Sequence, residues 1–156
     1  MVTAGTGDDR GRQDGRSEDA PVFAAIDLGT NNCRLLVARA HRSPPGSPAR
    51  DGFTVVDSFS RIVRLGEGLA VSGRLSDAAI ARTVDALFVC ANKIDRWGVA
   101  QQRHIATEAC RRAANCHNFV AQVAERTGLK LEIIPPIEEA RLALAGCLPL
   151  LDPAYE

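Results

Sequence analysis

FAAIDLGTNNCRLLV, residues 23–37, decides the fold: it consists of two apolar strands joined by a polar turn. Asp27 ends the first strand, where its carboxylate can hold a divalent cation directly or through water. Gly29 lacks a Cβ, so the backbone there can approach an anion closely and can adopt a positive φ. Residues 30–32, Thr-Asn-Asn, add N–H and side-chain donors in a turn, an arrangement that binds phosphate oxygens. Asp, Gly and Asn also recur in ordinary turns, so the rest of the chain must separate the two interpretations.

The composition is that of an intracellular globular domain. The chain has 156 residues, of which 46% are hydrophobic and 24% charged, and this length suits one domain. Lys plus Arg equals Asp plus Glu, at 19 each, so no overall field favours nucleic acid or an anionic membrane as partner. The five cysteines are scattered without a Cys-x-x-Cys pair, which favours free thiols in a reducing compartment. The N-terminus is polar where a signal peptide would be apolar, and we expect a cytoplasmic protein.

The first half of the chain predicts a disordered tail and then strands. Residues 1–20 are rich in Gly, Asp and Arg with almost nothing to bury, so we expect disorder there. Strands are expected over residues 21–27, 33–40 and 53–63, with a Pro- and Gly-rich loop over residues 42–52. After a flexible connection over residues 64–73, Ser76 is a good N-cap for a helix that ends at Gly98.

The second half alternates strands and helices. We expect a strand over residues 103–106 and then a helix over residues 109–114 that restarts at an Asn115 cap and ends at Gly128. A strand over residues 129–134 and a helix over residues 137–146 follow. The order β-β-β-α-β-α-β-α predicts an α/β fold, a mixed sheet with helices on its faces. Ligands gather at the carboxyl ends of strands in such sheets. Polar residues follow three strands (Asp27, Thr107-Glu108 and Glu138-Glu139), and this convergence favours a phosphate site over an ordinary turn.

Four segments carry a resemblance to a known family. Residues 25–37, AIDLGTNNCRLLV, resemble the first phosphate motif of the actin-like ATPase superfamily. RIVRLGEGL at 61–69, ATEACRRAAN at 106–115 and EEARLALAG at 138–146 resemble segments of the exopolyphosphatase/guanosine pentaphosphate phosphatase family, in the same order and at similar spacing. The resemblance covers about residues 22–147 and implies an actin-like (ribonuclease H-like) domain over residues 21–147.

The resemblance implies a Mg²⁺-dependent phosphohydrolase. Such an enzyme transfers the terminal phosphoryl group of inorganic polyphosphate, or the 5′ γ-phosphate of guanosine pentaphosphate, to water. Asp27 would organise the cation, and the phosphoryl group would be cradled by Gly29, Thr30 and Asn31. Glu139 best matches the glutamate that activates water, with its neighbour Glu138 as the alternative.

Further phosphate contacts are expected from the residues around these motifs, since Arg suits bidentate phosphate binding. The candidates are Asn32, Arg34, Arg61, Arg64, Glu108 and Arg111. Arg111 could instead lie on a solvated helix face. Glu108 could instead cap a helix or pair with an arginine.

The family's second glycine-rich phosphate motif, Asp-x-Gly-Gly-Gly-Ser, does not occur before Glu156. The resemblance therefore implies that half of the active site lies in a second domain of the same protein, with residues 148–156 as the start of a linker. We expect the isolated chain to have little activity and its exposed face to favour a homodimer. Two alternatives remain open: a non-catalytic module that binds polyphosphate or a guanosine alarmone, and an actin-like ATPase or sugar kinase domain.

Overall fold

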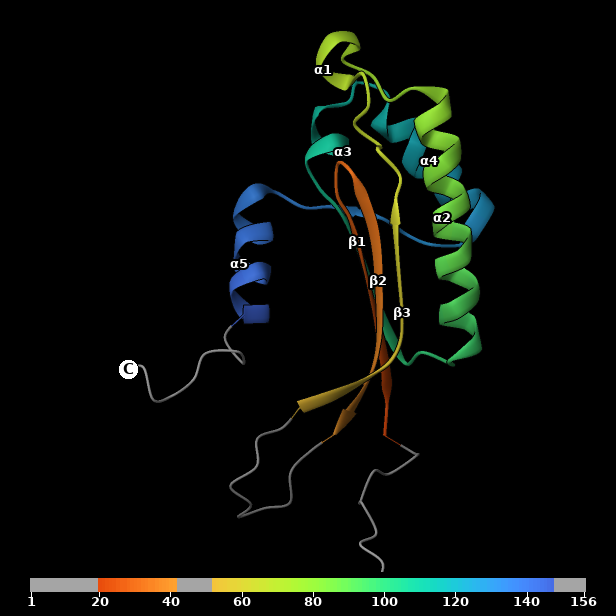
Figure 1. The fold of residues 1–156 in the computed structure, drawn as a ribbon, viewed down its shortest axis with the longest axis vertical. Coiled ribbons are helices and arrows are strands. Elements are labelled where there is room, and N and C mark those ends of the chain that lie inside the picture. The colour runs from red at the N-terminus through yellow and green to blue at the C-terminus, as the bar shows by residue number, and fades with distance from the viewer. Residues whose placement is uncertain (1–19, 42–51, 148–156) are drawn as a thin grey trace, which may run out of the picture.

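The computed structural model describes residues 20–41 and 52–147 (Figure 1). The predicted tail (apart from Ala20), most of the predicted loop and the predicted linker lie outside these residues. The elements are β1 (Val22–Leu28), β2 (Asn32–His41), β3 (Gly52–Ile62), α1 (Leu69–Ser72), α2 (Asp77–Arg96), β4 (Gln101–Ala106), α3 (Glu108–Arg112), α4 (Cys116–Thr127), β5 (Glu132–Ile133) and α5 (Pro136–Cys147).

The five strands form one mixed sheet in the order β3-β2-β1-β4-β5. β1 pairs antiparallel with β2, and β2 pairs antiparallel with β3. β4 runs parallel to β1 and to β5. The predicted mixed sheet and order of elements are confirmed, and the parallel half of the sheet brings the carboxyl ends of β1, β4 and β5 to one edge.

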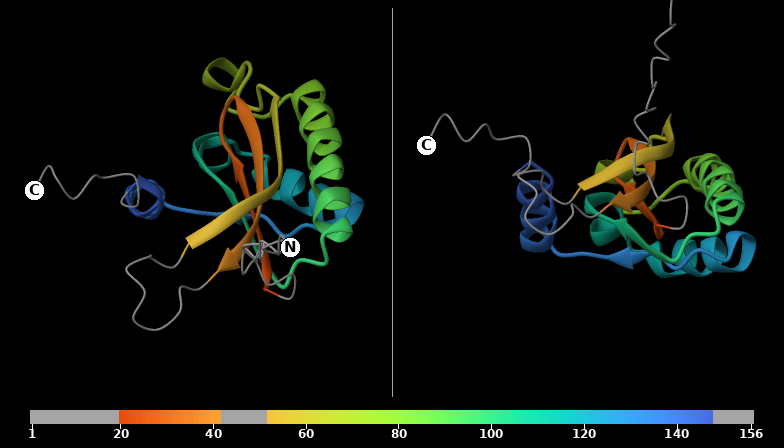
Figure 2. Two further views of the ribbon diagram at one scale, coloured as in Figure 1. Left: turned by 60° about the horizontal axis from the view of Figure 1, so that its bottom comes forward. Right: turned by 90° about the horizontal axis from the view of Figure 1, so that it is seen from below.

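The two faces of the sheet differ in their cover. Along β1, Ala24, Ile26 and Leu28 are buried while Ala25 and Asp27 are exposed, so the strand has one core face and one open face. The core face is covered by α2 and α4, and α5 lies on the other side of the sheet (Figures 1 and 2). Buried α2 and α4 side chains, among them Leu87 and Phe119, complete a single core with the strands.

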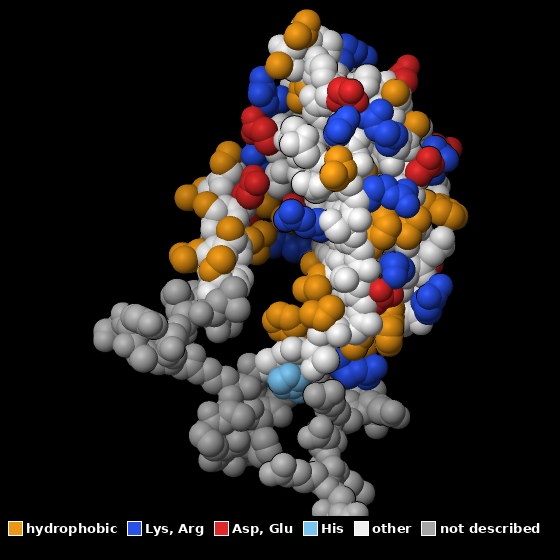
Figure 3. All heavy atoms as spheres, viewed as in Figure 1, with side chains coloured by type: hydrophobic (Ala, Val, Ile, Leu, Met, Phe, Trp, Pro, Cys, Tyr) orange, Lys and Arg blue, Asp and Glu red, His pale blue; other side chains and the backbone are white. Residues whose placement is uncertain are grey.

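Helix α5 has no buried residue. The side chains of Ile137 and Leu144 are 79% and 62% exposed. Figure 3 shows hydrophobic side chains on α5 and on the facing part of the molecule, with a hollow between them. α5 is therefore held in place by something other than burial of its own side chains.

Within the described ranges, no helix combines the length and the apolar character needed to cross a bilayer.

Helix α2 follows its predicted signals closely. The Ser76 Oγ accepts a hydrogen bond from the N–H of Ala79 at 3.2 Å, as expected of an N-cap. The helix ends at Arg96, two residues before Gly98, which has a φ of 55°.

Two elements differ from the sequence prediction. The strand expected over residues 129–134 is only two residues long, because Leu129 and Leu131 pack against the core and Pro135 lacks an N–H for further pairing. The connection over residues 64–73 contains the short helix α1, bounded by Gly68 and Gly73, which both have a left-handed φ. Neither β5 nor α1 is long enough to show a periodic pattern of hydrophobic residues in the sequence.

Asn115 occupies the N-cap position of α4, as predicted, but its side chain makes no capping hydrogen bond. Its Oδ1 instead accepts from the N–H of Leu75 at 2.8 Å, and its Nδ2 donates to the Leu75 carbonyl at 3.0 Å. Asn115 therefore joins the start of α4 to the segment that leads into α2.

Replacing Asn115 by Ala should lower the free energy of unfolding by about 2 kcal/mol, because both polar backbone groups of buried Leu75 lose their partner. Urea denaturation followed by circular dichroism measures this. The matched control is Asn118→Ala on the exposed side of α4, which should change stability by less than about 0.5 kcal/mol. Equal effects of the two variants would contradict the bridging role of Asn115.

Candidate active site

Three strand ends form one edge of the sheet, and backbone hydrogen bonds hold the chain segments that leave them. The N–H of Thr107, after β4, donates to the carbonyl of Leu28 at the end of β1 at 3.1 Å. The N–H of Ile134, after β5, donates to the carbonyl of Ala106 at 3.2 Å. The polar residues that follow the three strands therefore share one edge, as the sequence predicted.

The turn between β1 and β2 uses two of its carbonyl groups in hydrogen bonds to the segment after β3, and two of its N–H groups have no acceptor in the described part of the chain. The Asn31 carbonyl accepts from the N–H groups of Val63 (2.8 Å) and Arg64 (3.0 Å), and the Thr30 carbonyl accepts from Gly66 (3.0 Å). The N–H groups of Thr30 and Asn31 donate to no acceptor within residues 20–41 and 52–147. The turn thus offers backbone donors without a described acceptor, which suits a phosphate oxygen.

The structure corrects the role expected for Gly29 and adds one for Gly66. Gly29 does not have a positive φ, and its N–H donates to the Asn32 carbonyl at 2.9 Å within the turn. A Cβ added to Gly29 would lie 3.7 Å from that carbonyl oxygen, an ordinary contact. A Cβ on Gly66 would instead collide with Cγ2 of Thr30, so Gly66 is the glycine that close packing on the turn requires.

Arg64 lies in the segment that covers the turn and has a φ of 49°. It is the one non-glycine residue with a left-handed φ in the described part of the chain. Such a conformation costs about 1–3 kcal/mol and tends to cluster at functional sites. Its side chain is exposed and makes no ion pair with a described residue, so it remains a candidate phosphate contact.

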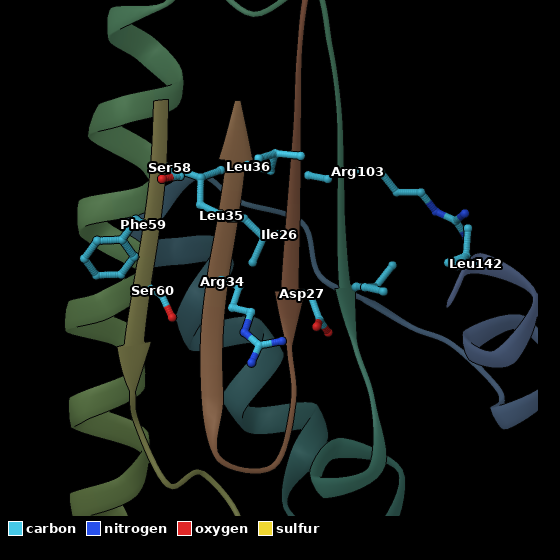
Figure 4. A pocket seen from close by; sticks show the side chains of 12 residues that line it. Ile26, Asp27, Arg34, Leu35, Leu36, Ser58, Phe59, Ser60, Arg103 and Leu142 are labelled. Atoms are coloured by element: carbon cyan, nitrogen blue, oxygen red, sulfur yellow. The ribbon is translucent and has the colours of Figure 1, made fainter. Parts of the chain in front are cut away.

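Asp27 and Arg34 lie side by side on the open face, in register across β1 and β2. Figure 4 shows both side chains on the same side of the sheet. Burial raises the pKa of the Asp27 carboxyl, the charge of Arg34 lowers it, and the charge of Glu139 raises it. The Asp27 carboxyl on β1 is therefore coupled electrostatically to Arg34 on β2 and to Glu139 on α5.

Arg111, a predicted phosphate contact, instead holds other parts of the site together. Its Nη1 donates to the carbonyl of Ile134 at 2.7 Å and to the Glu139 carboxylate at 3.0 Å. Its Nη2 donates to the Glu108 carboxylate at 3.1 Å. With its side chain only 19% exposed, Arg111 is an internal link among α3, the end of β5 and α5.

The two adjacent glutamates that the sequence left as alternatives point to different partners. Glu138 accepts from Arg103 at 3.3 Å and lies 3.5 Å from Arg141. Glu139 accepts from Arg111, and its charge acts on Asp27. Glu139 is therefore the glutamate that faces the strand-end site.

The other predicted site residues are Asn32, Glu108 and Arg61. Asn32 is the first residue of β2, and Glu108 pairs with both Arg111 and Arg112 at the start of α3. Arg61 lies over the ring of Phe59, 5.1 Å from its centroid, on the face of the sheet covered by α2. The expectation that Arg61 contacts a phosphate chain stays a prediction.

An open groove of about 530 Å³ runs along the open face of the sheet toward α5. Asp27 and Arg34 are the two lining residues that were expected to belong to the site. The others are polar (Ser58, Ser60 and Arg103) or apolar (Ala25, Ile26, Leu35, Leu36, Phe59, Ile105 and Leu142). The two-residue alternation of strands was the signal that could have placed Arg103 and Ile105 on this face.

Substitutions should shift the pKa of Asp27 in opposite directions if the three side chains meet as described. Arg34→Gln removes a positive charge and should raise this pKa, and Glu139→Gln removes a negative charge and should lower it. Carboxyl ¹³C NMR titration measures the pKa directly. Glu125→Gln, on the exposed side of α4, serves as the charge-matched control. No response of Asp27 to Glu139→Gln would contradict the proximity of the two carboxylates.

Comparisons with known proteins identify relatives of this chain. A family model described as "Ppx/GppA phosphatase family" matches residues 44–153, more than half of the chain. Exopolyphosphatase 2 of Mycobacterium tuberculosis is 38% identical over 130 residues, which are 80% of this chain and 40% of that protein. The guanosine-5′-triphosphate,3′-diphosphate pyrophosphatase of Photobacterium profundum is 31% identical over 131 residues, covering 84% of this chain and 25% of that protein.

A solved structure extends the likeness to the fold. The crystal structure of an Aquifex aeolicus member of the Ppx/GppA family matches with a TM-score of 0.73 and 30% identity, over 81% of this chain and 39% of that chain. The chain spans less than half the length of each of these relatives. The predicted α/β fold, a mixed sheet with helices on its faces, is confirmed. The chain belongs to the Ppx/GppA phosphatase family.

Proposed function

We propose that this chain is the N-terminal half of a phosphohydrolase that releases terminal phosphate from inorganic polyphosphate, guanosine pentaphosphate or both. The names of the two relatives support these substrates. The observation that carries the proposal is the position of Glu139. Its carboxylate is held by Arg111 and acts on Asp27 at the edge where the turn offers unpaired N–H groups.

The residues of the turn supply the electrostatic part of the reaction. Phosphoryl transfer needs positioning and charge stabilisation more than covalent chemistry. The Thr30 carbonyl lies in the same planar peptide unit as the Asn31 N–H, so its hydrogen bond with Gly66 fixes the direction of that N–H, which can meet a phosphoryl oxygen with little rearrangement. Arg34 and Arg64 make no ion pair with described residues and can add positive charge beside it.

Glu139 is placed to act as the general base. A carboxylate within reach of a water molecule in line with the phosphoryl group can take its proton as the bond to phosphorus forms. Arg111 fixes the side-chain direction through one carboxylate oxygen, Oε2, and leaves Oε1 without a partner among the described residues. That oxygen is the proton acceptor in our proposal.

The carboxylates of Asp27 and Glu139 also suit the expected cofactor, Mg²⁺. Mg²⁺ is usually held by one or two carboxylates together with water and substrate phosphates, not by a full cage of protein ligands. No group of three or more His, Cys, Asp or Glu side chains suited to a metal ion occurs within the ranges that the structure describes. Asp27, with Glu139 nearby, provides such a partial site, and a bound cation would supply charge neutralisation for the phosphate oxygens.

The other half of the site would come from a second domain. The matched region covers only 40% of the exopolyphosphatase relative. We therefore propose that the phosphoryl group lies on one wall of a two-walled cleft. The chain by itself should then bind phosphate compounds but turn them over slowly.

Replacing Glu139 by Gln in the complete polypeptide that the reading frame encodes should lower kcat for polyphosphate about 100- to 10,000-fold, because the proton acceptor is lost. Binding of polyphosphate should persist. Release of phosphate, measured with malachite green, and equilibrium binding to labelled polyphosphate give the two quantities. Glu138→Gln removes the same charge at the neighbouring position and should have a much smaller effect on kcat.

Three outcomes would contradict the proposal. Unchanged kcat in Glu139→Gln would favour a non-catalytic module that binds polyphosphate or an alarmone. An equal loss of activity in Glu138→Gln would remove the distinction between the glutamates. Hydrolysis of ATP with no activity on polyphosphate or guanosine pentaphosphate would favour an actin-like ATPase.

A further inference from the structure

Arg103 lies outside the four family-like segments and was not expected to belong to the site. It projects from β4 on the open face and lines the groove. Its Nε and Nη2 donate to the two carboxylate oxygens of Glu132 on β5, at 2.9 and 3.0 Å. A two-point contact of this kind fixes both the position and the plane of the guanidinium group.

The remaining nitrogen of Arg103 reaches α5. Its Nη1 donates to Oε1 of Glu138 at 3.3 Å. Figure 4 shows the side chain extending from the sheet across the groove to α5, near Leu142. One guanidinium group thus joins β4, β5 and the first turn of α5.

Helix α5 depends on such contacts because no residue in it is buried. Ion pairs join its first turn to the rest of the domain at two points, Arg103 with Glu138 and Arg111 with Glu139. Successive residues of a helix point about 100° apart around its axis. Fixing Glu138 on Arg103 therefore fixes the direction in which Glu139 points.

We propose that Arg103 is a positioning residue: clamped by Glu132, it holds Glu138 and so orients the first turn of α5 with Glu139 facing Asp27. This inference rests on the proposed role of Glu139 as the base. Arg103 itself does not contact the substrate, because all three of its nitrogen atoms already face the carboxylates of Glu132 and Glu138, which neutralise its charge.

The test compares Arg103→Gln and Arg103→Lys with Arg126→Gln, a control of the same charge change on exposed α4. Hydrogen–deuterium exchange of the chain should show about 10-fold faster exchange of α5 amides in Arg103→Gln, with α2 amides unchanged. In the complete polypeptide, kcat for polyphosphate should fall about 10-fold with KM within about 2-fold, since a small displacement of a catalytic group costs rate more than binding. Lys keeps the charge but not the two-point contact, so it should restore only part of both properties.

A second variant distinguishes the proposed role of Arg103 from a general loss of folding in the Arg103 variants. Glu132→Gln leaves Arg103 in place and weakens its anchor, so it should produce the same pattern in α5 exchange and kcat at smaller size. Unchanged α5 exchange in both variants would overturn the inference. A raised KM with normal kcat would also overturn it, because that result makes Arg103 a substrate contact. If the wild-type polypeptide hydrolyses no polyphosphate, the proposed function fails, and the exchange data still decide whether Arg103 holds α5.

Discussion

The parallel pairing of β1 with β4 and of β4 with β5 is the constraint on which the site depends. Parallel strands must end at the same edge, so the turn after Leu28, the segment after Ala106 and the start of α5 are brought together although they are far apart in sequence. The antiparallel β2 then returns from the turn and adds Arg34 beside Asp27. A different strand order would separate the proposed phosphate donors from the proposed base.

Ion pairs orient the side chains that the strand order brings to this edge. Arg111 and Arg103 each bind two carboxylates, and each has one of its partners on the first turn of α5. These pairs are partly exposed, so they contribute modestly to stability, but they orient a helix that buries none of its own side chains. At the Asp27 carboxylate, partial loss of solvent and the charge of Glu139 disfavour the charged form, and the charge of Arg34 favours it. A cation or a phosphate-bound metal would relieve that repulsion.

The sequence was sufficient for features that local patterns specify. Strand alternation, the Ser76 cap and the order of elements predicted the sheet and α2, and the position of acidic residues after strands predicted the shared edge. Features that depend on contacts between residues far apart in the chain could not be predicted from the sequence. The side chain of Asn115 serves Leu75 and not its own helix, and Arg61 turns to the covered face. Arg111 binds carboxylates where a phosphate contact was expected, and only the fold reveals Arg103 between β5 and α5.

The central claim is that the turn at Thr30 and Asn31 binds the phosphoryl group. The most direct measurement is a titration of the ¹⁵N-labelled chain with tripolyphosphate and Mg²⁺, followed through its backbone amide signals. The account predicts that the largest shifts occur at the amides of Thr30 and Asn31, with smaller ones at the segment around Arg64 that covers the turn. Shifts confined to exposed arginines elsewhere, such as Arg74 and Arg96, with none in the turn, would contradict it.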